Sequence, residues 1–256
     1  MKIAISGKGG VGKTLLASLL VKIFADFGYS VLAIDADPDA NLAANLGFPE
    51  PEKITPISEL SDVIEERVGA KPGEPGSFFR LNPKVDDLPD KYAARMDGIR
   101  LMVMGRIKRG GTGCYCAEGA LVQALLSHLL LQNKEVVVLD MEAGIEHLTR
   151  GTARGVDRLI VVVEPGRRSI ETARRIFELA GDLAMSRVSV VGNKIQNDEQ
   201  KQFIISSLQG ADFLGFIPYD ETVINADLDN RTIMSSITVV SEVKKIFERL
   251  IISVEK

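Results

Sequence analysis

The chain has 256 residues, of which 45% are hydrophobic, enough to bury a substantial core in one α/β domain. Its formal net charge of −4 argues against non-specific nucleic-acid binding as the main role. No apolar run approaches the ~20 residues of a membrane span, and the first residues lead into a predicted strand rather than a signal peptide. We therefore expect a cytoplasmic protein that acts on neither nucleic acids nor membranes.

Apolar runs alternate with helix-periodic segments along the chain, and the apolar runs are continuous, as in parallel strands buried on both faces. This pattern predicts an α/β fold with a doubly wound, mostly parallel sheet flanked by helices, in a single domain over residues 1–256. A Pro- and Gly-rich stretch predicts a small irregular insertion around residues 70–98, with a short strand near Phe78 and Phe79. Strands are predicted at residues 2–6, 30–35, 99–104, 135–140, 158–163, 188–194 and 213–218, and helices at about 15–24, 57–68, 118–131, 169–183 and from Ser236.

Residues 7–14, GKGGVGKT, fit the phosphate-loop pattern G-x-x-x-x-G-K-[ST] between the first strand and the first helix. Glycines let the backbone turn tightly and direct its N–H groups at phosphate oxygens, with the positive end of the helix dipole behind them. The pattern predicts that Lys13 reaches the β- and γ-phosphates and that the Thr14 hydroxyl holds Mg²⁺. The other nucleotide-binding residues of the loop are predicted to be Lys8, Gly9, Gly10, Val11 and Gly12.

Acidic residues directly follow two of the predicted strands. Asp35, Asp37 and Asp39 lie at the end of the second strand, and Asp140 ends the apolar run of the Walker B pattern. Ligands of open α/β sheets bind outside the carboxyl ends of the strands, so these acids are candidates for the phosphate and metal site. Asp140 is predicted to serve Mg²⁺. For the acids after the second strand, the alternative is that they cap the helix that follows.

The two cysteines, Cys114 and Cys116, lie one residue apart in a glycine-rich loop that leads into a predicted helix. They cannot readily form a relaxed disulfide with each other, and two thiolates alone do not complete a tetrahedral metal site. Two chains related by a two-fold axis would supply four sulfur ligands for one ion. The alternative is a pair of buried, inert cysteines, against which the flanking glycines and nearby basic residues argue.

A second lysine, Lys8, follows the first glycine of the loop. The motif K-G-G-x-G-K-T resembles the deviant phosphate loop of the family that includes the nitrogenase iron protein, the septum-positioning and partition ATPases and the arsenite pump ATPase. This resemblance implies an ATP-dependent homodimer in which Lys8 crosses the two-fold axis to the partner's nucleotide. There it would neutralise charge on the phosphates, as an arginine finger does. The alternative is a solvent-exposed Lys8 without such a role.

The same resemblance implies roles for residues after the second strand, where this family has the form D-x-D-P-x-x-N/D. Asp37 would lie near the γ-phosphate and Mg²⁺ and orient the attacking water, and Asn41 would come near the water shell of the Mg²⁺ ion. Asp35 would be structural, and Asp39 could compete with Asp37 for the catalytic role.

Two late positions match the base-binding residues of this family. Asn193, at the end of a strand, would contact adenine, and Pro218, after the last strand, would line its other side. Together they favour ATP over GTP.

With the segment G-x-G-C-x-C-x-E-G-A-L around Cys114 and Cys116, the whole chain resembles the CooC family of carbon monoxide dehydrogenase accessory ATPases. The resemblance implies that a cysteine pair from each subunit binds Ni²⁺, or Zn²⁺ as a competitor, at the dimer interface. It also implies carbon monoxide dehydrogenase as the client, although the similar acetyl-CoA synthase maturation ATPases leave the client open. The alternatives are an iron–sulfur reductase or scaffold ATPase, and a positioning ATPase that acts on membranes or DNA.

Overall fold

The computed structural model describes residues 1–37, 39–70, 80, 83–105, 121, 124–125, 135–142, 156–223 and 236–252. The strands in these ranges are β1 Lys2–Gly7, β2 Ser30–Ala36, β3 Ala94–Met96, β4 Ile99–Val103, β5 Glu135–Met141, β6 Arg158–Val163, β7 Val188–Ile195 and β8 Asp212–Pro218. The helices are α1 Lys13–Asp26, α2 Leu42–Leu46, α3 Ser61–Val68, α4 Leu88–Tyr92, α7 Arg167–Asp182, α8 Asp198–Ser207 and α10 Ile237–Ile252, with 3₁₀ turns η1 Pro51–Lys53 and η2 Ile57–Glu59.

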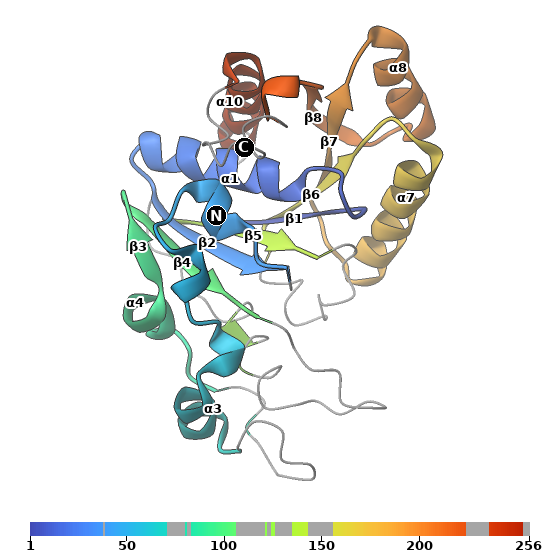
Figure 1. Cartoon of the computed structure of the whole chain (residues 1–256). Coiled ribbons are helices and arrows are strands. Elements are labelled where there is room, and N and C mark those ends of the chain that lie inside the picture. Colours follow the sequence, from blue (N-terminus) through green and yellow to red (C-terminus); the bar gives the residue numbers. More distant parts are fainter. Residues whose placement is uncertain are drawn as a thin grey trace.

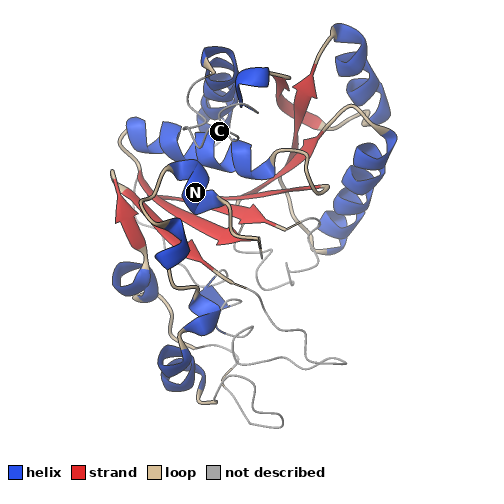
Figure 2. Ribbon diagram, in the orientation of Figure 1, coloured by secondary structure: helices blue, strands red, loops and turns tan. Residues whose placement is uncertain are grey.

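Within the described residues, eight strands form one sheet in the order β3-β4-β2-β5-β1-β6-β7-β8 (Figures 1 and 2). All neighbouring strands are parallel except β3 and β4, which are antiparallel. The predicted doubly wound, mostly parallel fold is therefore confirmed. Because β1 lies inside the sheet and the chain leaves it toward both edges, the carboxyl end of β1 is where a ligand of such a sheet is expected.

Each face of the sheet carries its own apolar core. In β1, Ile3 and Ile5 pack into the core beneath α1, α2 and α10, whereas Ala4 faces the core beneath α3, α7 and α8. Figure 1 shows α1 and α10 lying next to each other over one face of the sheet. Among the described helices, none combines the length and the apolar character that crossing a membrane requires.

The predicted elements differ from the structure in several details. The helix predicted at 57–68 begins as the 3₁₀ turn η2, and α3 starts only at Ser61, because Leu60 leaves the helical conformation at φ −78° and ψ 68°. The predicted insertion is partly regular, since it contains α4 and β3, and β3 extends the sheet beyond β4. The strand predicted near Phe78 and Phe79 lies outside the described residues, as does most of the helix predicted at 118–131.

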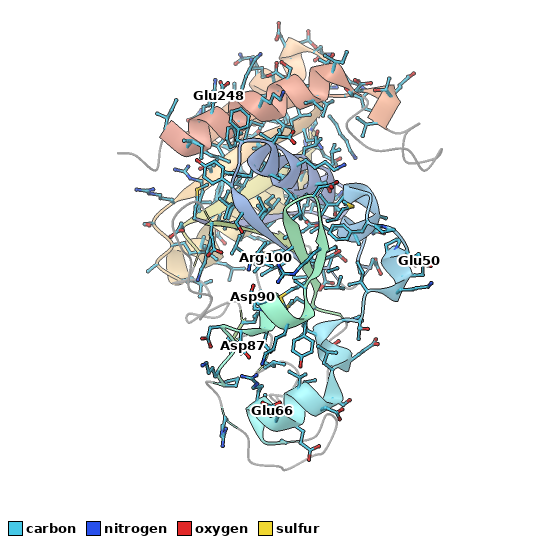
Figure 3. All side chains as sticks on the ribbon, turned by 90° about the vertical axis from the view of Figure 1, so that its left-hand side faces the viewer. Glu50, Glu66, Asp87, Asp90, Arg100 and Glu248 are labelled. Atoms are coloured by element: carbon cyan, nitrogen blue, oxygen red, sulfur yellow. The ribbon has the colours of Figure 1, made fainter. Side chains whose placement is uncertain are left out.

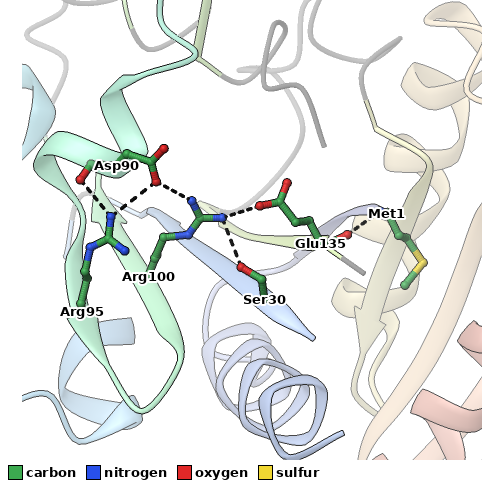
Figure 4. Close-up of polar contacts among 6 residues, drawn as sticks. All are labelled: Met1, Ser30, Asp90, Arg95, Arg100 and Glu135. Atoms are coloured by element: carbon green, nitrogen blue, oxygen red, sulfur yellow. Dashed lines mark hydrogen bonds and ion pairs between the residues drawn. The ribbon is translucent and has the colours of Figure 1, made fainter. Parts of the chain in front are cut away.

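Arg100 fastens the insertion to the amino end of the sheet. Its guanidinium donates to the Asp90 carboxylate on α4 and to Glu135 at the start of β5, each at 3.0 Å, and to the hydroxyl of Ser30 at 3.4 Å (Figure 4). Figure 3 shows Arg100 and Asp90 between Glu66 on α3 and Glu248 on α10, which lie toward opposite ends of the molecule. These contacts lie at the amino ends of the strands, whereas the phosphate loop lies at their carboxyl ends.

Candidate nucleotide site

The phosphate loop joins β1 to α1 through two glycines that no other residue could replace without strain. Gly7 has φ +152°, and a Cβ atom there would lie 2.4 Å from the Val162 carbonyl oxygen of β6. Gly12 has φ +95°, and a Cβ atom there would lie 2.2 Å from the Asn193 side-chain nitrogen of β7. Both glycines therefore serve a positive φ and a close approach at once. The loop fits against the ends of the two strands beyond β1.

Consecutive residues at the end of β7 hold the outside of the loop. Asn193 Nδ2 donates to the Val11 carbonyl at 2.7 Å, and Lys194 Nζ donates to the Gly10 carbonyl at 2.7 Å. Lys194 has a φ of +59°, a conformation that is uncommon for a residue with a side chain. Because these bonds use carbonyl oxygens, they orient the loop without using the N–H groups that an anion requires.

Asn193 is 2% exposed, and its side-chain oxygen also accepts a hydrogen bond from the Lys194 N–H at 2.9 Å. The structure therefore places Asn193 against the phosphate loop. Its predicted contact with adenine stays a prediction.

Asp140 at the end of β5 is a buried acid whose carboxylate is poorly satisfied. It is 1% exposed, and neither carboxylate oxygen has a hydrogen-bond partner among the described residues. Burial raises the pKa of Asp140 to about 7, an effect that the nearby Thr14 hydroxyl and Lys13 oppose and that the charges of Asp35 and Asp37 reinforce. A buried carboxylate whose hydrogen-bonding capacity is poorly met is suited to bind a cation. Hydroxyl and carboxylate oxygens are ligands that suit Mg²⁺, so the residues present fit this ion.

The acids at the end of β2 differ in role: Asp35 is buried and bonded to the backbone, whereas Asp37 is open to a ligand. Asp35 is fully buried, and its carboxylate accepts hydrogen bonds from the N–H groups of Asp37 at 3.1 Å and Leu42 at 2.9 Å. Burial raises the pKa of Asp35 to about 6 despite these bonds. Asp35 thus shapes the turn and caps α2, which agrees with the expected structural role. Asp37 is partly exposed and accepts from the Asp39 N–H at 3.0 Å, and Asn41 is exposed and makes no capping bond with its side chain.

Glu164, directly after β6, is a further charged residue of this edge, to which the sequence reasoning gave no role. Its two carboxylate oxygens pair with Lys8 Nζ and Lys194 Nζ, each at 3.3 Å. Its N–H donates to the Ser169 hydroxyl in the first turn of α7 at 3.1 Å. The signal was in the sequence, because Glu164 directly follows a predicted strand, close to its carboxyl end as Asp35 and Asp140 are to theirs.

Comparison with known proteins shows the family of this chain. Residues 2–233 match the model of the CobQ/CobB/MinD/ParA nucleotide binding domain. The chain belongs to the CobQ/CobB/MinD/ParA family. It is 45% identical over 229 residues to the carbon monoxide dehydrogenase accessory protein CooC of Rhodospirillum rubrum, covering 89% of this chain and 87% of CooC. The resemblance to the CooC family is therefore confirmed, and the chain is an ATPase.

Other relatives support the same family. The chain is 46% identical over 253 residues, 98% of each chain, to an uncharacterized ATP-binding protein of Methanocaldococcus jannaschii. It is 27% identical over 242 residues to an iron-sulfur cluster carrier protein of Pyrococcus abyssi, covering 86% of this chain and 74% of that protein. The solved MinC:MinD complex of Aquifex aeolicus contains the same fold, with a TM-score of 0.69, 22% identity and coverage of 98% and 95%.

The predicted phosphate and metal residues lie at the carboxyl ends of neighbouring strands of the sheet. Asp35 and Asp140 are register partners on β2 and β5, and β1 lies on the other side of β5. Lys13 at the start of α1 is 6% exposed, and its charge acts on Asp140. The carboxyl ends of these strands thus combine a buried cation, a buried acid and a glycine loop, which together can bind a magnesium-bound triphosphate.

The predicted base residues Asn193 and Pro218 do not line one pocket, and the predicted cargo residues fall outside the described part of the chain. Pro218 ends β8 and borders a pocket of about 430 Å³ that is also lined by Ile195, Phe216 and Arg249, whereas Asn193 is absent from its lining. Cys114 and Cys116 lie outside the described residues. Within the described part of the chain, no group of three or more His, Cys, Asp or Glu residues could hold a metal ion.

Proposed function

We propose that this ATPase is a maturation factor that delivers nickel to carbon monoxide dehydrogenase, with the metal ion as its cargo. The observation that supports the client is the 45% identity to CooC of R. rubrum over 89% of the chain. The sequence adds the Cys114 and Cys116 pair, which is suited to a soft metal ion shared between two subunits. In this proposal, binding of ATP brings two copies of the chain together face to face.

In this proposal, the residues at the carboxyl ends of the strands have separate roles in ATP hydrolysis. Lys13 compensates the charge of the β- and γ-phosphates, and the loop N–H groups of Gly9 to Gly12 cradle them. Asp37 orients the attacking water, and Lys8 of the partner subunit approaches the phosphates from across the interface.

Thr14 and Asp140 would hold Mg²⁺, with Asp37 and Asn41 beside its water shell. When bound, Mg²⁺ neutralises charge on the phosphate oxygens. Asn193 and Pro218 lie on either side of the adenine in this proposal.

The cargo site is formed by the cysteines at the two-fold axis. Cys114 and Cys116 from each of two subunits give four thiolates around one ion, which suits Ni²⁺ and also its competitor Zn²⁺. ATP hydrolysis then changes the conformation of the residues near the γ-phosphate and separates the subunits, which opens the cargo site.

The Cys114→Ser, Cys116→Ser double variant tests the cargo site. We expect the wild-type protein to bind one Ni²⁺ per dimer and the variant to bind none in stoichiometric amount, with ATP binding largely unchanged. Bound metal is measured after gel filtration, and ATP affinity by titration calorimetry. Lys13→Ala is the converse variant: it should lose ATP binding, and with it the ATP-driven dimer, although both cysteines remain. One ion per dimer in the double variant would refute the shared site.

An iron–sulfur scaffold is the second candidate, because the chain is also similar to the iron-sulfur cluster carrier of P. abyssi. Anaerobic purification separates the two functions. A brown protein with charge-transfer absorption that disappears in the cysteine double variant would favour the cluster, whereas a colourless protein that binds Ni²⁺ favours the metallochaperone.

A further inference from the structure

We propose that Glu164 is a positioning residue for Lys8, which it holds on its own subunit until the nucleotide of the partner subunit takes Lys8 over. This inference rests on the proposed action of Lys8 across the dimer interface. It adds a step that the phosphate-loop motif does not contain, namely where this lysine is kept before the dimer forms.

The ion pair itself is the first observation. Lys8 Nζ lies 3.3 Å from Glu164 Oε1, and the side chains are 36% and 25% exposed, respectively. A contact of this kind between partly exposed groups is weak and reversible. It therefore restrains Lys8 without locking it.

Glu164 is fixed more firmly than the lysine it holds. Its backbone N–H is bonded to the Ser169 hydroxyl, and its second carboxylate oxygen pairs with Lys194 at 3.3 Å. Lys194 is itself bonded to the Gly10 carbonyl at 2.7 Å. Lys8 has a long side chain with several rotatable bonds at the start of a glycine loop, so Lys8 is the group that can move.

The second lysine makes the transfer of Lys8 feasible. When Lys8 leaves, Glu164 retains its ion pair with Lys194, so no carboxylate is left without a counter-charge. A triphosphate offers Lys8 more negative charge than one carboxylate does, and charge-assisted bonds to phosphate are strong. ATP in the partner subunit therefore competes successfully with Glu164.

In a two-fold dimer, the competition between Glu164 and the nucleotide for Lys8 affects the dimerisation constant twice. A two-fold dimer with two nucleotides requires two Lys8 side chains to leave two Glu164 carboxylates. Loss of the pair should favour the dimer by about threefold per subunit, as for a partly exposed ion pair, and thus by about tenfold per dimer.

The test measures the dimerisation constant by analytical ultracentrifugation with Mg²⁺ and a non-hydrolysable ATP analogue. We expect Glu164→Gln to tighten the dimer about tenfold in the Lys8 background and to have no effect in the Lys8→Met background. Glu242→Gln, which removes the exposed pair with Lys245 on α10, is the control and should change nothing. An equal effect of Glu164→Gln with and without Lys8, or no effect at all, refutes the proposal.

A second measurement follows the nucleotide-free protein, in which amine acylation of single lysines is quantified by mass spectrometry. Glu164→Gln should raise the labelling rate of Lys8 about threefold and leave that of Lys245 unchanged, while Glu242→Gln should do the reverse. An unchanged Lys8 rate overturns the proposed contact. A wild-type protein that forms no dimer with the analogue would instead overturn the action of Lys8 in the partner, and a dimer that is insensitive to Glu164→Gln overturns this inference alone.

Discussion

The two ends of the same sheet treat buried charge in opposite ways. At the amino ends of the strands, Arg158 donates to the Ser189 hydroxyl at 2.6 Å and to Asp212 at 3.0 Å, and Arg100 is paired with two carboxylates. At the carboxyl ends, Asp140 is buried without a partner among the described residues. The charges at the amino end form ion pairs that stabilise the fold, whereas the carboxyl end keeps a buried acid that a bound cation would favour.

We expect a glycine-to-alanine substitution in the phosphate loop to lower ATP affinity far more than the same substitution at a glycine elsewhere. Gly12→Ala forces its Cβ against Asn193 and strains a positive φ, so ATP affinity should fall at least about tenfold. Gly28→Ala is the matched control, with φ +81° and nothing within 4 Å of its Cβ. It should cost about 1 kcal/mol of stability and leave ATP affinity unchanged. Calorimetric titration with ATP measures both variants, and equal losses in affinity would contradict the tight fit.

At the amino end, removal of one partner should affect stability alone. Arg158→Met leaves Ser189 and Asp212 without their buried donor, and we expect a loss of about 2 kcal/mol in the free energy of unfolding. The turnover of ATP per folded molecule should stay within about twofold of wild type, because the described partners of Arg158 lie at the amino ends of the strands, away from the phosphate loop. Urea unfolding and steady-state phosphate release measure the two quantities. A large loss of turnover in the folded variant would show that the two edges are coupled.

The smallest expected effect is the change in stability on replacing Asp140, and its sign depends on pH and on bound ligand. The pKa of Asp140 is raised to about 7, so its contribution to stability is present below pH 4 and is lost as the pH rises through 7. Without nucleotide and Mg²⁺, Asp140→Asn should therefore raise the free energy of unfolding at pH 8. The gain should be about 1–2 kcal/mol once the cost of burying the asparagine amide is subtracted, and almost nothing near pH 4.

With Mg²⁺ and ATP at pH 8, the wild-type protein should instead be more stable than Asp140→Asn. The ligands stabilise the wild-type protein by mass action, whereas Asp140→Asn lacks the carboxylate for the ion and gains little. Thermal unfolding at pH 4 and pH 8, with and without the ligands, gives all four comparisons. A variant that is less stable than wild type in the ligand-free protein at pH 8 would show that Asp140 has a partner of its own.

Local sequence patterns predicted most of the strands and helices, and they were enough to nominate candidates for the centre of the site. The continuous apolar runs predicted the strands because burial on both faces leaves that signature in any short window. The phosphate loop and Asp140 were predictable because their residues are adjacent in sequence or fixed relative to a strand end. The helices α2 and α8 were missed, since α2 is only five residues long and the first half of α8 is mostly polar.

The sequence by itself determined that a strand, a glycine loop and a helix form a nucleotide cradle, and that acids follow the strands beside it. Only the tertiary structure decided which distant groups complete that cradle. Asn193 and Lys194 reach the loop across 182 and 184 residues of chain, and Glu164 reaches Lys8 across 156. The physical reason is that side-chain periodicity is set locally, whereas the partner of a charged side chain depends on which strands become neighbours in the sheet.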